Sequence, residues 1–96
     1  MQIEKNIKGN DFIIIDECMI HEQALAVPGR MLRHAEFMRL VSEGFPFLEL
    51  GICGPFWLET RISCMMRAVM IVQPNGTAVP GRYDKTFLCY YFGFKK

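Results

Sequence analysis

The chain has 96 residues, which is enough for one domain with a single hydrophobic core. Its 11 Lys and Arg residues nearly balance 10 Asp and Glu residues, and a net charge of +1 gives no field that would favour nucleic acid, an anionic membrane or a polyanionic substrate. Hydrophobic residues make up 51% of the chain, more than so small a domain easily buries, so we expect a second copy, or failing that a ligand, to cover part of the apolar surface.

The first ten residues are polar, and residues 1–10 are predicted to form a flexible arm or an edge element ahead of a single domain over residues 11–96. They contain no apolar signal-peptide core, and no apolar run in the chain approaches the roughly 20 residues needed to cross a bilayer. We therefore expect a cytoplasmic protein that has no membrane partner.

The helical and strand patterns begin beyond this arm. Residues 12–15 are aromatic or β-branched, which predicts a short buried strand. Residues 17–27 fit neither a helical nor a strand period, and Pro28 limits any helix there. Apolar residues recur at spacings of three and four over residues 30–43 and Gly44 follows them, so this segment is predicted to be the main helix.

The second half of the chain has β character. Apolar runs separated by Gly-Pro and Asn-Gly pairs predict strands over residues 48–52, 56–62, 64–73 and 86–94. The Asn75-Gly76 pair predicts a tight hairpin after the third of these runs. The expected fold is therefore α+β, with a mostly antiparallel sheet of about four or five strands packed against one main helix at residues 30–43.

The segment Ala-Val-Pro-Gly-Arg occurs twice, at residues 26–30 and 78–82. Pro followed by Gly fits the two central positions of a type II turn, where Gly accepts a positive φ. Because the flanking sequences differ in period, we interpret the repeat as one turn used twice and not as a duplicated unit. Arg30 and Arg82 close the two copies, and an arginine held by a rigid turn suits capture of a carboxylate or phosphate.

A metal or acid–base site is one alternative, and it depends on the two histidines, His21 and His34. If residues 17–25 are helical, Glu17 and His21 lie one turn apart on one face, and His34 could complete the site. The spacing matches no defined motif, and both H-E-x-x-H and C-x-x-C are absent. We therefore expect no cofactor, and the metal set Glu17, His21 and His34 stays an alternative.

A broader alternative is a small-molecule site in a pocket between helix 30–43 and the sheet. Such pockets combine aromatic walls with a few polar groups. The candidate ligand-binding residues are His21, Arg30, His34, Trp57, Arg82 and Tyr83. The chain would then be an anion-binding or metal-binding protein, or a small enzyme.

Residues 82–96 interleave Lys and Arg with Tyr and Phe. Aromatic side chains on a sheet face can stack on bases while cations bind phosphates, so a single-stranded nucleic-acid binder is a further alternative. The near-neutral charge of the chain argues against it.

The preferred interpretation is a small, non-enzymatic, self-associating module with a protein-interaction or accessory role. The chain has seven methionines, and Met is an adaptable filler of subunit contacts. Met65, Met66 and Met70 are the predicted interface residues. The expected partners are a second copy and, beyond it, another protein.

Overall fold

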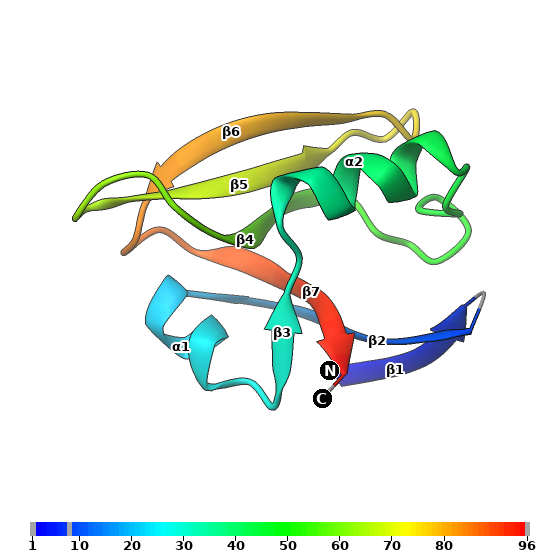
Figure 1. Ribbon diagram of the computed structural model, residues 1–96, viewed down its shortest axis with the longest axis horizontal. Helices are drawn as coiled ribbons and strands as arrows, with labels where there is room; N and C mark the ends of the chain where they lie inside the picture. The colour runs from blue at the N-terminus through cyan, green and yellow to red at the C-terminus, as the bar shows by residue number, and fades with distance from the viewer. Residues whose placement is uncertain (1, 8, 96) are drawn as a thin grey trace.

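A computed structural model describes residues 2–7 and 9–95, and its arrangement is shown in Figure 1. Within these residues the chain forms seven strands and two helices. In chain order they are β1 (Gln2–Ile7), β2 (Asn10–Met19), α1 (His21–Ala26), β3 (Gly29–Met31), α2 (His34–Ser42), β4 (Gly54–Arg61), β5 (Met66–Val72), β6 (Ala78–Asp84) and β7 (Cys89–Lys95).

The last strand, β7, holds the sheet together. The strand order is β1-β2-β7-β4-β5-β6, with β3 also paired to β7. One edge of β7 pairs antiparallel with β2, while the other pairs antiparallel with β3 at Phe94 and parallel with β4 at Tyr90. Figure 1 shows β7 running from the layer that contains β4, β5 and β6 to the layer that contains β1 and β2.

Both faces of the sheet are covered at β2 and β7, which explains the continuous apolar runs in these two strands. Alternate residues of a strand point to opposite faces. Accordingly, Phe12 and Ile14 enter one core cluster and Ile13 enters the other. The larger cluster packs beneath α2 and the loop that follows it, and the smaller one includes Ala24 of α1.

The predicted sheet of four or five mostly antiparallel strands against one main helix is wrong. The sheet has seven strands and is mixed, because β4 and β7 run parallel. The predicted helix over residues 30–43 is also too long. Gly29–Met31 instead pair with residues 93–95 of β7, so the backbone hydrogen bonds of this segment go to the sheet and α2 begins only at His34.

The β-rich second half is partly as expected. The hairpin at Asn75-Gly76 is confirmed, since it joins β5 to β6 and Gly76 has a φ of 87°. The strand predicted over residues 48–52 is absent from the described residues. That segment forms turns, in which the Leu50 amide donates to the Pro46 carbonyl and Gly51 has a φ of 71°.

The two Pro-Gly pairs do not form the predicted type II turns. In the first pair Pro28 precedes β3 and Gly29 is its first residue, and the second pair lies within β6. The described glycines with positive φ are Gly9, Gly44, Gly51, Gly54 and Gly76, so neither Gly29 nor Gly81 uses the conformational freedom that the prediction required.

Gly29 is required instead by the close approach of other atoms. A Cβ at this position would lie 2.7 Å from both the Phe94 carbonyl oxygen and the Tyr91 hydroxyl oxygen. At Gly81 the nearest atoms belong to the side chains of Val69 and Ile71, at 3.3 Å. The repeated glycine therefore serves packing in both copies, and the packing is much tighter in the first.

Parts of the predicted N-terminal arm form an edge strand, since residues 2–7 pair along β2 as β1. Residues 1 and 8 of that arm lie outside the described part of the chain, as does residue 96. Among the described residues, no helix has the length and apolar character needed to cross a membrane.

Candidate functional site

Three chain segments meet at one end of the molecule, which we call the loop end: α1, residues 62–65 between β4 and β5, and residues 85–88 between β6 and β7. All three lie at the left of Figure 1. The backbone of Lys85 joins them, because its amide donates to the Met65 carbonyl at 2.8 Å and its carbonyl accepts from the His21 amide at 3.1 Å.

Exposed apolar side chains concentrate at this end. The described residues expose seven large hydrophobic side chains, and five of them belong to the loop end. We call these five the apolar collar: Leu25, Ile62, Met65, Phe87 and Leu88. The most exposed are Leu25 at 62% and Leu88 at 60%, and the Phe87 ring packs on Tyr83 at 5.2 Å between centroids.

A pocket of about 260 Å³ opens among these segments. Its lining comes from α1 and the residue before it, from β5 and from the β6–β7 turn. The lining residues are Ile20, His21, Glu22, Leu25, Arg67, Lys85 and Thr86.

His21 is the buried polar residue of this pocket. Its side chain is 5% exposed, its ring meets Trp57 edge-on at 5.2 Å, and its Nε2 is buried with no hydrogen-bond partner. Burial lowers the pKa of His21, and the positive charge of Arg67 acts in the same direction, whereas the Leu58 backbone opposes them. The imidazole is therefore uncharged at neutral pH.

Arg67 brings a fixed positive charge to the pocket. Its Nη1 donates to the carbonyls of Ser63 at 2.7 Å, Met66 at 3.1 Å and Cys64 at 3.4 Å. These acceptors hold the guanidinium in place and are uncharged, so they do not neutralise it.

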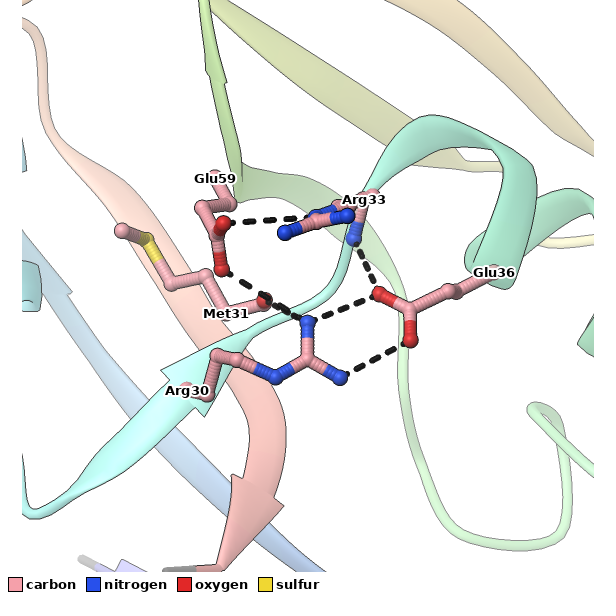
Figure 2. A network of polar contacts seen from close by, with 5 residues as sticks. All are labelled: Arg30, Met31, Arg33, Glu36 and Glu59. Carbon is pink, nitrogen blue, oxygen red and sulfur yellow. Dashed lines mark hydrogen bonds and ion pairs between the residues drawn. The ribbon is translucent and has the colours of Figure 1, made fainter.

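Arg30 has a different environment, shown in Figure 2. Its guanidinium donates to both carboxylate oxygens of Glu36, at 2.9 and 2.8 Å, and lies 3.5 Å from Glu59. It also stacks over the Phe94 ring at 5.0 Å. Arg33 completes the network through its Nε, 3.3 Å from Glu59. The Arg30 side chain is thus engaged by α2, β4 and β7, and the candidate anion-binding group is used within the chain.

Of the predicted ligand-binding residues, the structure brings His21 and Trp57 into ring contact, but the set as a whole does not form one site. Trp57 is fully buried and its Nε1 donates to the Met19 carbonyl at 2.7 Å. Tyr83 is half-buried on β6, and Arg82 is exposed on the same strand. His34 is exposed at the start of α2, whereas His21 is buried in α1.

The alternative metal set is likewise dispersed. Glu17 is an exposed residue of β2, and the two histidines lie on different helices. Within residues 2–7 and 9–95, no group of three or more His, Cys, Asp or Glu side chains is placed to hold a metal ion.

The three predicted interface methionines differ in burial. Met70 is fully buried in the larger core cluster, because its position on β5 faces that side of the sheet. Met66 is half-buried, and Met65 is 46% exposed as part of the apolar collar. Only Met65 therefore presents a large exposed apolar surface.

Sequence reasoning missed the polar residues that accompany His21 in the pocket, namely Glu22, Arg67, Lys85 and Thr86. Each of them is ordinary in its local context. The backbone contacts of Lys85 with Met65 and with α1 bring them together, and these contacts have no local sequence signal.

Comparisons with family models, with curated proteins and with solved structures found no match to this chain.

Proposed function

We propose that this protein is a self-associating module, in which the apolar collar of one copy packs against the collar of a second copy. The observation that supports the proposal is the concentration of five of the seven exposed large hydrophobic side chains at one end of the molecule. Exposed apolar groups that gather in one place mark interaction surfaces, whereas single exposed ones are ordinary.

The mixed positive and negative charges of the loop end favour a second copy as the partner. The pocket beside the collar carries Glu22 together with Arg67 and Lys85, and the whole chain has a net charge of only +1. In a twofold contact the same patch meets itself, so a patch whose charges nearly cancel can meet its own copy without net repulsion. A strongly charged partner would gain little from such a surface.

The free edge of β6 is a weaker candidate for self-association. β6 lies at the end of the strand order and is therefore an edge strand. It carries Pro80, which lacks a backbone donor, and the charged residues Arg82 and Asp84. Proline and charge are the usual features that protect an edge strand from pairing with another chain.

The molar mass in solution tests the proposal. We expect size exclusion with light scattering to give a dimer mass for the wild-type protein at high micromolar concentration. The double variant Phe87→Ser, Leu88→Ser is expected to be monomeric with nearly unchanged thermal stability, because both side chains are more than half exposed.

The matched control is Leu48→Ser, since Leu48 is 55% exposed and lies outside the collar. This variant should keep the dimer mass. A monomeric wild-type protein, or a collar variant that still has the wild-type mass, would overturn the proposal.

A further inference from the structure

Three kinds of group line the pocket at the loop end: two cationic side chains, one carboxylate and an apolar surface. Arg67 and Lys85 supply the positive charges and Glu22 supplies the negative one. Ile20 and Leu25 form the apolar part. All of these residues come from one chain, so the pocket does not depend on self-association.

One of the two cations, Arg67, starts from a fixed position, because carbonyls of Ser63 and Cys64 in the preceding loop hold its Nη1. Hydrogen bonds to Met65 and from His21 hold the Lys85 backbone, which places the base of its side chain beside the pocket. A carboxylate entering the pocket would therefore meet a guanidinium that loses little conformational entropy on binding.

The remaining polar groups favour a hydrogen-bond donor or a cation. Thr86 donates its hydroxyl to Asp84 at 2.7 Å, so the remaining capacity of this hydroxyl is as an acceptor. The Glu22 carboxylate is negative, and Asp84 lies behind Thr86 with a second negative charge. These groups disfavour a simple anion, because they oppose the attraction of Arg67 and Lys85.

His21 adds a second and independent indication of a ligand. It lines the pocket and its buried Nε2 has no partner in the chain. Native proteins rarely leave a buried polar atom without a partner, and a water, an ion or a functional role is the usual explanation of such an exception.

The geometry points to a small zwitterion with an apolar tail, namely a free apolar α-amino acid, as the ligand of this pocket. The ligand carboxylate lies with Arg67 and Lys85, its ammonium with Glu22 and the Thr86 hydroxyl, and its tail against Ile20 and Leu25. A volume of about 260 Å³ accommodates a molecule of this size.

A series of matched small molecules tests the assignment. The probes are L-leucine, isocaproate, which lacks the ammonium, isopentylamine, which lacks the carboxylate, and glycine, which lacks the tail. Binding is measured by calorimetry and by the imidazole proton resonances of His21 in NMR spectra. We expect L-leucine to bind at least about tenfold more tightly than each of the three truncated molecules, because each lacks one of the matched contacts. The exposed His34 lies on the other helix, so its resonances should not move.

Two variants separate the charges. Glu22→Gln should weaken binding of L-leucine by about fivefold and should not weaken binding of isocaproate, since only leucine carries the ammonium. Lys85→Met should weaken binding of L-leucine and isocaproate alike and should not weaken binding of isopentylamine. Glu49→Gln and Lys5→Met make the same chemical changes at exposed positions outside the pocket and should have no effect.

Three results would overturn the inference: no binding of L-leucine by wild-type protein, equal affinity for leucine and its truncated analogues, or binding that neither pocket variant weakens. Thermal unfolding of each variant checks that it is folded. Light scattering with and without L-leucine keeps this result distinct from self-association, because a monomer that binds leucine supports the pocket while contradicting the proposed dimer.

Discussion

Arg30 and Glu36 form a bidentate ion pair, with Nη1 to Oε1 at 2.9 Å and Nη2 to Oε2 at 2.8 Å. The pair joins β3 to the first turn of α2, and Figure 2 shows Glu59 of β4 beside it. Parallel N–H···O bonds of this kind fix orientation as well as adding energy. Arg30 therefore positions α2 on the sheet, which is a structural role for a residue whose sequence context suggested ligand binding.

Removing this guanidinium should destabilise the fold, and the second copy of the repeat supplies the control. We expect Arg30→Ala to lower the free energy of unfolding by about 1–2 kcal/mol, because it removes a bidentate pair and a cation–π contact that are still partly open to solvent. Arg82→Ala, at an exposed position of β6, should change it by less than about 0.5 kcal/mol. Urea unfolding measures both, and equal effects would contradict the assigned role.

The same pair predicts how stability depends on pH. Hydrogen bonding from Arg30 lowers the pKa of Glu36 from its ordinary value of 4.5 to about 2. A carboxyl group whose folded pKa is depressed stabilises the protein above the unfolded pKa, and that contribution is lost as pH falls through the folded pKa. The stability difference between the wild type and Glu36→Gln should therefore be constant above about pH 5 and shrink towards pH 2. Urea unfolding across this range measures it, and a difference that does not change with pH would contradict the prediction.

The sequence predicted local turns and buried runs better than it predicted pairing. Asn75-Gly76 specifies its own hairpin, and residues 12–15 are apolar because both faces of β2 are covered. The helical period over residues 30–43 extended too far at its start, because Met31 fits that period equally well as a buried strand residue. Pairing with β7 makes residues 29–31 a strand, and β7 lies more than half the chain away in sequence.

The residues of the candidate site were also hard to predict, because segments distant in sequence bring them together. His21 was identified as a polar candidate because histidines are few and chemically distinctive. Arg67 and Lys85 were not, since an isolated cation in a strand or a turn has no local signal that separates it from a solvated one. Their contact with His21 and with the loop backbone arises only when β5, β6 and α1 are assembled.

The two glycines of the repeat should respond differently to alanine. A Cβ at Gly29 would lie 2.7 Å from the backbone oxygen of Phe94, and backbone in a paired strand cannot easily move away. We expect Gly29→Ala to cost about 2–3 kcal/mol of unfolding free energy, the upper part of the usual range of about 1–3 kcal/mol for overpacking. At Gly81 the neighbours at 3.3 Å are side-chain atoms, so Gly81→Ala should cost less than about 1 kcal/mol. Chemical denaturation distinguishes the two, and a milder effect at Gly29 would contradict this packing.

Thiol labelling should separate Cys89 from the other cysteines. Cys18, Cys53 and Cys64 are exposed, whereas Cys89 is fully buried in the smaller core cluster. Burial raises the pKa of the Cys89 thiol to about 12, and the neighbouring Cys18 adds to the shift. Because the thiolate is the reactive form, the native protein at pH 8 should release three equivalents of chromophore from a disulfide reagent quickly, and the fourth only on unfolding.

The variant Cys89→Ala is the control for this experiment, since it should give three equivalents in both the native and the denatured state. In the wild type, the rate of the fourth equivalent should rise with urea in step with the loss of structure, because reaction requires opening of the core around Trp57 and Tyr91. Four thiols that react at similar rates in the native protein would mean that β7 does not hold Cys89 in the core.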